Sequence, residues 1–166
     1  HTRFRNVTGV QTCALPICCV SLSSFPFIDT SQGTNFTQTW YNCYSLTSFP
    51  LINTSNGTNF TSTWNNCNKL ISFPSINTGS GTNFYATWYK CTSLSSFPLI
   101  DTSKGNDFRY SWAGDYPWWP YTVMNLSAFP LLNTLSGKDF EGAWRGNTRL
   151  TSFPTLSFNN ATNFYC

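Results

Sequence analysis

The residues best suited to direct contact with a ligand are four aromatic side chains in the segment DYPWWPY, residues 115–121. They are Tyr116, Trp118, Trp119 and Tyr121. Aromatic side chains are enriched among the residues that dominate binding energy at interfaces, so these rings could stack on sugars or anchor a protein partner. They could instead fold over neighbouring apolar residues as a hydrophobic flap. The sequence leaves both alternatives open, and the four residues are its candidate partner-binding residues.

Catalytic chemistry has few candidate groups in this sequence. A nucleophile needs a base within reach, but the only histidine is His1 and the whole chain has six carboxylates. Asp29 and Asp101 occupy equivalent positions three repeats apart, and the repeats between them carry Asn53 and Asn77. The sequence therefore predicts a non-enzymatic protein with no catalytic residue, no paired-carboxylate site and no cofactor.

Four cysteines recur at one constant interval, at Cys19, Cys43, Cys67 and Cys91. In stacked coils about 4.7 to 4.9 Å apart, parallel Cβ atoms would be farther apart than the roughly 3.8 Å usual in disulfides. A zinc site is not expected, because none of the four belongs to a CxxC pair. We expect buried thiols that act as small hydrophobic side chains.

Residues 1–17 are excluded from reasoning about the fold. The string VTGVQTCALPI, residues 7–17, resembles the translation of a common sequencing-library adapter, and we interpret residues 1–17 as an artefact derived from it. The repeat supports this boundary, because Cys19 lies one full repeat before Cys43. Excluding the segment removes His1 and two of the nine basic residues, which leaves seven basic against six acidic residues.

The candidate aromatic, acidic and cysteine residues named above belong to a repeat that covers residues 18–166. A Phe-Pro pair recurs at the same interval as the cysteines, with one longer step before Phe129, at Phe25, Phe49, Phe73, Phe97, Phe129 and Phe153. A fixed period in this range is typical of solenoids. The sequence predicts a single solenoid of about six coils, with an eight-residue insertion near residues 113–125. Insertions in such repeats often lie on the binding face, and this one contains the aromatic segment.

Each coil is expected to contain a short parallel strand and a short helix. In the coil at residues 46–69, the strand covers residues 46–49 and ends at Pro50, because proline donates no ladder hydrogen bond. A turn follows with a positive φ at Gly57. Phe60, Trp64 and Cys67 then have the i, i+4, i+7 spacing of one helical face, and Asn59 is a favourable N-cap. This pattern predicts an α/β repeat solenoid of the leucine-rich-repeat type; the alternative is an all-β solenoid with a second strand at residues 59–67.

The repeat CxxLxSFPxIxTSxGTNFxxTWxxC, residues 43–67, resembles the BspA-like leucine-rich repeats of bacterial surface proteins and lipoproteins, which typically read CxxLxxLxLxxFxTxxVxNMxxMFxxC. The shared features are the Leu, the Asn-Thr turn, the Asn-aromatic step and the Cys. The chain departs from that family at Phe-Pro, at Thr-Trp, and where Val123 and Asn147 replace the Cys. The resemblance implies a surface or secreted adhesion module, and it transfers no catalytic residues.

Composition narrows the range of partners. Charged residues make up 9% of the chain, against about a quarter in typical globular proteins. A nucleic-acid-binding protein needs a face of Lys and Arg, so nucleic acid is not an expected partner. No run is apolar and long enough to span a bilayer.

Threonine also recurs, in a ladder at Thr30, Thr54, Thr78, Thr102 and Thr134. Flat TxT arrays resemble ice-binding faces, and the chain has such triplets at residues 37–39 and 61–63. The equivalent triplets at residues 85–87, 109–111 and 141–143 break the pattern. Hydroxyls that stabilise turns and helix starts are the simpler explanation.

The sequence thus favours a non-enzymatic repeat module that mediates adhesion or protein contact outside the cell, at a cell surface or on a phage particle. Contacts are expected through the aromatic segment and through the outward positions Thr47, Ser48 and Pro50. A carbohydrate-binding module that uses Trp118 and Trp119 is the alternative, and ice binding is a third possibility. Both termini look cut, so we expect a fragment of a longer array.

Overall fold

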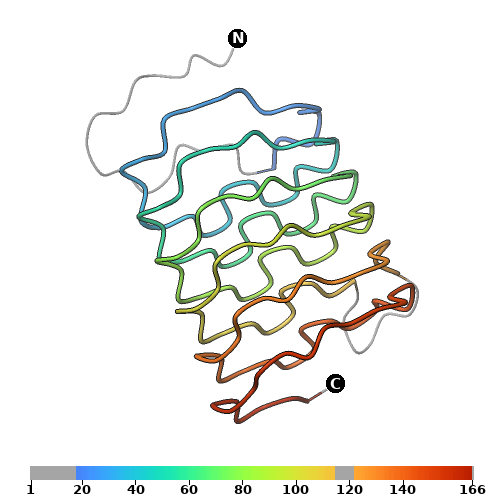
Figure 1. Ribbon diagram of the computed structural model, residues 1–166. Helices are drawn as coiled ribbons and strands as arrows, with labels where there is room; N and C mark the ends of the chain where they lie inside the picture. Colours follow the sequence, from blue (N-terminus) through green and yellow to red (C-terminus); the bar gives the residue numbers. More distant parts are fainter. Residues whose placement is uncertain (1–17, 115–121, 166) are drawn as a thin grey trace.

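Ladders of stacked aromatic rings hold successive coils together. The computed structural model describes residues 18–114 and 122–165, and Figure 1 shows the coils lying side by side along one axis. The ring of Phe49 stacks between Phe25 and Phe73, with centroids 5.7 and 5.9 Å away. Equivalent residues of neighbouring coils are therefore in contact, as the fixed period of the sequence predicts.

The tryptophans form a second ladder that interlocks with the first. Trp64 stacks on Trp40 at 5.4 Å and on Trp88 at 5.8 Å, and it is fully buried. The ring of Phe49 also meets Trp40 and Trp64 edge-on, at 4.7 and 5.3 Å. Aromatic pairs contribute about 0.5 to 1.5 kcal/mol beyond the area that they bury. All six apolar positions predicted for this coil are buried: Leu46, Phe49, Ile52, Phe60, Trp64 and Cys67.

The stack continues across the insertion. Trp112 stacks on Trp144 at 5.6 Å, and Phe108 stacks on Phe140 at 5.1 Å. After the insertion Met124 is fully buried, and its N–H donates to the carbonyl of Gly146 at 3.1 Å. The one longer interval of the repeat therefore leaves the register of the ladders unchanged.

The predicted helix is wrong. No residue in the described ranges is helical, and the segment at residues 60–67 is a run of turns. Four N–H groups cross to carbonyls of the following coil at 2.6 to 2.9 Å instead of bonding within a helix, and they belong to Phe60, Ser62, Trp64 and Asn66. The φ angles of Ser62 and Asn66 are +51° and +65°, which a right-handed helix does not contain. The N–H groups of Thr63 and Asn65 close turns three residues back, to Phe60 at 3.2 Å and to Ser62 at 3.3 Å.

The predicted strand and the all-β alternative are wrong as well. The described residues contain only isolated parallel bridges, at 24–48, 35–59, 59–83, 83–107, 107–139, 128–152 and 139–163. The N–H of Thr47 donates to Ser23 at 3.0 Å, but Pro50 has no N–H to extend the pairing. Residues 59–67 cannot be a second strand, because only Asn59 is bridged and turns follow it. The chain is therefore a stack of coils built from turns, without the helix and strand of a leucine-rich repeat.

The role predicted for the recurrent glycine is also wrong. Among the glycines of the described residues, a positive φ occurs at Gly142 and Gly146 and not at Gly57. A Cβ on Gly57 would lie 2.6 Å from the Cζ atom of Phe60 and 2.8 Å from Cε2 of Phe36. Glycine is required at this turn because two aromatic rings pack directly against its backbone.

Candidate binding surface

The four aromatic residues singled out in the sequence, Tyr116, Trp118, Trp119 and Tyr121, lie in residues 115–121, outside the described residues. The structure does describe both ends of the insertion. The N–H of Gly114 donates to Arg145 at 2.8 Å at one end, and Met124 is buried at the other. The outward positions Thr47 and Ser48 are exposed as expected, whereas Pro50 is half-buried.

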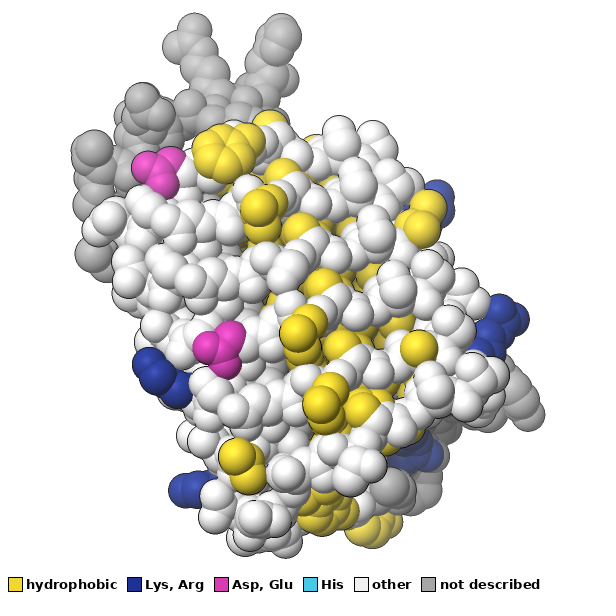
Figure 2. All heavy atoms as spheres, viewed as in Figure 1, with side chains coloured by type: hydrophobic (Ala, Val, Ile, Leu, Met, Phe, Trp, Pro, Cys, Tyr) yellow, Lys and Arg dark blue, Asp and Glu magenta, His cyan; other side chains and the backbone are white. Residues whose placement is uncertain are grey.

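A row of exposed apolar side chains runs across several coils. We call it the apolar stripe; its members, with their exposed fractions, are Phe27 at 74%, Leu51 at 63%, Leu99 at 64% and Leu131 at 63%. Figure 2 shows apolar side chains gathered in a band across this face. Contiguous exposed apolar surface is typical of interaction sites.

Sequence reasoning missed the apolar stripe, although a signal for it exists. Each stripe residue lies two positions after the buried ladder Phe and directly before a buried or half-buried Ile or Leu. A tight turn follows the proline in the fifth coil, where the N–H of Leu132 donates to the carbonyl of Pro130 at 3.0 Å. In this coil Leu131 is exposed while Phe129 and Leu132 are buried. An apolar residue that repeats at an outward position has no role in the core.

A ladder of amide and carboxylate side chains borders the stripe, at Asp29, Asn53, Asn77, Asp101 and Asn133. Each accepts a hydrogen bond from the backbone N–H two residues later, as Asn53 does from Ser55 at 3.1 Å and Asp101 from Ser103 at 2.9 Å. These N–H groups stabilise the ionised carboxylates and lower the pKa values of Asp29 and Asp101. The border therefore carries fixed amides and two negative charges.

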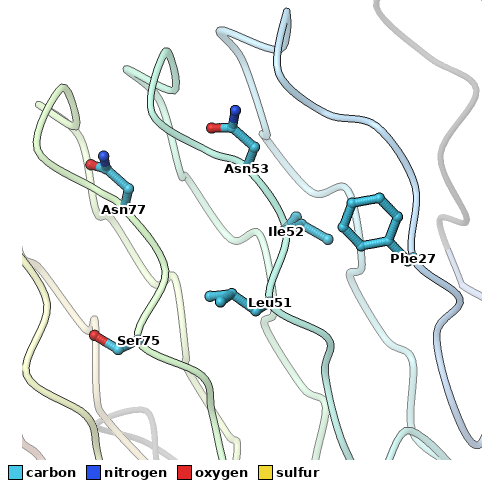
Figure 3. A pocket seen from close by; sticks show the side chains of 6 residues that line it. All are labelled: Phe27, Leu51, Ile52, Asn53, Ser75 and Asn77. Atoms are coloured by element: carbon cyan, nitrogen blue, oxygen red, sulfur yellow. The ribbon is translucent and has the colours of Figure 1, made fainter.

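An open depression of about 400 Å³ lies where the stripe meets this ladder. Figure 3 shows its lining residues, which are Phe27, Leu51, Ile52, Asn53, Ser75 and Asn77. Ser75 occupies the position that Leu51 and Leu99 hold in the coils on either side. The small side chain of Ser75 thus interrupts the stripe beside the depression.

The cysteine ladder lies inside the stack. Cys43, Cys67 and Cys91 are buried, and Cys19 is half-buried. The thiols of Cys67 and Cys91 donate to the carbonyls of Trp40 and Trp64, at 3.2 and 3.0 Å. Burial raises the pKa of Cys91 to about 12. Both are inert internal thiols, as predicted, and they also carry hydrogen bonds that the prediction did not include.

Asn147 replaces this cysteine after the insertion and preserves its hydrogen bond. Its Nδ2 donates to the carbonyl of Trp112 at 2.7 Å, as the cysteine thiols do to the tryptophan of the preceding coil. The substitution of Cys by Asn at this register therefore exchanges one donor for another.

The threonine ladder faces inward. Thr30, Thr54, Thr78, Thr102 and Thr134 are all buried. The hydroxyl of Thr78 donates to the carbonyl of Asp101 in the next coil at 2.6 Å, and that of Thr63 donates to Phe36 in the preceding coil at 2.9 Å. These hydroxyls hold neighbouring coils together rather than stabilising turns or helix starts, so the simpler explanation of the sequence pattern was wrong about their role.

No protein-family model, curated protein sequence or solved structure matches the chain. Within residues 18–114 and 122–165, no helix is long and apolar enough to cross a membrane. Over the same residues, no group of three or more His, Cys, Asp and Glu side chains is arranged to hold a metal ion.

Proposed function

We propose that this chain is a non-enzymatic repeat module that makes adhesive contacts with proteins outside a cell, on a cell surface or on a phage particle. The observation that carries the proposal is the apolar stripe, since each of its four side chains is mostly open to solvent. Leaving such a row exposed is unfavourable unless a partner covers it.

The state of the reactive side chains supports a binding role over catalysis. The thiols of Cys67 and Cys91 are buried and hydrogen-bonded. The carboxylate of Asp107 is occupied by Arg109, with the Nη2 and Oδ2 atoms 2.7 Å apart. Asp29 and Asp101 accept backbone N–H groups of their own turns.

The apolar stripe is tested by the double variant Leu99→Asn/Leu131→Asn, which makes half of the stripe polar without touching the interior. Thr155→Asn is the matched control, because Thr155 has the same register in the last coil and is already polar and exposed. Binding of the immobilised chain to a panel of purified extracellular proteins is the measurement. We expect saturable binding to at least one of them, weakened about tenfold or more in the double variant and unchanged in the control.

Two results would contradict this function. One is the absence of saturable binding to every protein of the panel. The other is equal binding by the native chain and the double variant while both retain the same thermal unfolding midpoint.

The alternative function is a carbohydrate-binding module that uses the tryptophan pair of the insertion. The adjacent residues Trp118 and Trp119 favour it, because indole rings are large apolar surfaces with a polar edge. A glycan array with the native chain and with Trp118→Ala/Trp119→Ala separates the two functions. Glycan binding that disappears in the variant supports the alternative, and protein binding that survives in it supports the apolar stripe.

A further inference from the structure

The depression beside Ser75 combines an apolar wall with fixed hydrogen-bond donors. Phe27 is the single aromatic residue of the apolar stripe, is 74% exposed, and forms one side of the depression (Figure 3). Asn53 and Asn77 lie next to each other on another side. Ser75 leaves open the place that a leucine fills in the neighbouring coils.

The two amides are held in one orientation. The Oδ1 atom of Asn53 accepts the N–H and the hydroxyl of Ser55, at 3.1 and 2.8 Å. The Oδ1 atom of Asn77 accepts the N–H of Gly79 at 3.1 Å. Neither Nδ2 group donates to any residue that the structure describes, so each offers two N–H donors. Because the oxygens are fixed by the turns, these donors are ready for a ligand without loss of side-chain freedom.

The carboxylates beside the depression disfavour an anionic ligand, and Lys104 offsets part of the charge of Asp101. The coils on either side carry Asp29 and Asp101 at the register of the two amides, and backbone hydrogen bonds keep both carboxylates ionised. An anionic ligand such as a phosphate or an acidic sugar would be repelled from this edge. Hydroxyl groups suit it, because a hydroxyl oxygen accepts hydrogen bonds from the amide N–H groups that line the depression.

A pyranose ring has both required surfaces. Its face of C–H groups carries the weak positive charge that an aromatic face attracts, and its rim consists of hydroxyls. We propose that the depression formed by Phe27, Asn53, Ser75 and Asn77 is a binding site for a neutral saccharide, with the sugar face on Phe27 and its hydroxyls on the two amides. This site shares Phe27 and Leu51 with the apolar stripe, but its test uses other ligands and changes neither Leu99 nor Leu131.

The test begins with a glycan array that includes neutral, sialylated and sulfated glycans, using protein from a host without N-glycosylation because residues 53–55 form an Asn-Thr-Ser sequon. The neutral glycan with the strongest signal is then titrated by calorimetry. Three variants are compared with the native chain: Phe27→Ala, Asn53→Ala/Asn77→Ala, and Ser75→Leu.

Ser75→Leu is the variant that tests the depression most directly. It restores the leucine that neighbouring coils carry and fills the depression, so we expect a folded protein with at least tenfold weaker sugar binding. Phe27→Ala and the double asparagine variant should weaken binding by a similar factor. Thr155→Ala is the matched control, since Thr155 has the register of Ser75 in the last coil and lies outside the depression, and we expect unchanged affinity.

Several results would overturn the proposal. They are the absence of binding to any neutral glycan, a preference for acidic glycans, and undiminished affinity in folded Ser75→Leu. Loss of binding in Trp118→Ala/Trp119→Ala, with full binding in Ser75→Leu, would place the sugar on the insertion instead. Protein binding through Leu99 and Leu131 can fail or succeed independently of all these outcomes.

Discussion

At the scale of single residues, the recurrent glycine shows how ring packing selects an amino acid. The backbone at Gly57 has no positive φ, so another residue could adopt its conformation. The obstacle is the aromatic ring three residues later, because its Cζ atom would lie 2.6 Å from an added Cβ. The last coil carries Ala161 at this register, where the ring of Phe164 is 48% exposed.

Gly57→Ala should therefore destabilise the protein by about 1 to 3 kcal/mol, the usual cost of overpacking a core. Gly79→Ala is the control, because the atoms nearest its Cβ would belong to polar side chains and not to a ring, with Asp101 Oδ2 at 2.8 Å and Asn77 Oδ1 at 3.5 Å. We expect less than about 0.5 kcal/mol for the control, measured by denaturant unfolding. Equal losses in the two variants would show that ring contact is not the reason for the glycine.

The buried thiol of Cys91 predicts a dependence of stability on alkaline pH. Burial raises its pKa from 9.0 to about 12, so the folded state binds a proton that the unfolded state releases above pH 9. This contribution to stability is complete below pH 9 and is lost as the pH rises toward 12. Cys91→Ala should show a smaller fall in unfolding free energy between pH 9 and pH 12 than the native chain. An identical fall in both would remove Cys91 as a cause.

At the scale of elements, the segment after each Asn or Asp shows what sequence reasoning could and could not predict. The side chain of Asn59 does accept a backbone hydrogen bond, from the N–H of Thr61 at 3.0 Å, and Phe60, Trp64 and Cys67 do face inward. A helix and this run of turns share the same inward spacing. They differ in where the N–H groups bond, and that depends on the neighbouring coil, which a local pattern does not contain.

The two glycines of the fifth coil do distinguish turns from a helix. Gly142 and Gly146 have positive φ, and they share the register of Ser62 and Asn66. Left-handed conformations cost other residues roughly 1 to 2 kcal/mol. The turn prefers glycine at both sites, whereas a helix would be weakened by it.

Gln38→Gly should consequently stabilise the protein by about 1 kcal/mol, because Gln38 is exposed and has a φ of +55°. Thr37→Gly is the control at the adjacent exposed residue, and it should destabilise by about 0.5 to 1 kcal/mol. Thermal unfolding of the two variants gives the comparison. Destabilisation by both would support a helix, and the far-ultraviolet circular dichroism of the native chain should then show helical minima, which the turns would not produce.

At the scale of the whole molecule, stability depends on position in the stack. Phe60 lies between Phe36 and Phe84, with ring centroids 5.4 and 5.5 Å away, and is fully buried. Phe164 has the same register in the last described coil, stacks on Phe140 at 5.5 Å, and is half exposed. A ladder residue in an inner coil contacts the coils on both sides, because each coil of a solenoid contacts only its neighbours.

Phe60→Ala should cost about 3 to 5 kcal/mol, as is usual for removing a buried aromatic ring. Phe164→Ala should cost at most half as much, because part of its surface is already in water. Denaturant unfolding monitored by tryptophan fluorescence measures both. Equal losses of unfolding free energy in the two variants would contradict this prediction and would mean that another surface covers Phe164 in solution.

The candidate site was less predictable than the stack. The core follows from the period alone, because stacking brings equivalent residues together whatever the backbone does between them. The outward direction of Leu131 depends on the tight turn after Pro130, and the depression depends on Ser75 being small where its neighbours are large. Neither the outward direction nor the depression follows from the period of the sequence. The period describes the residues that all coils share, and the depression exists where one coil differs from the others.

The hydrogen bonds that cross between the turn segment at residues 60–66 and its equivalents point one way, whereas those of Thr47, Thr58 and their equivalents point the other way. The N–H of Phe36 donates to Asn59, that of Phe60 to Asn83, that of Phe84 to Asp107, and the chain continues through Asp139 to Asn163. Peptide groups joined head to tail in this manner add their dipoles and polarise one another, as they do along a helix. A single line of peptide groups thus runs through six coils at right angles to the backbone, with its positive pole toward residue 163. The molecule contains no helix in its described residues, yet this line has the polarity of a helix dipole, opposed in part by the reverse lines through Thr58 and Thr47.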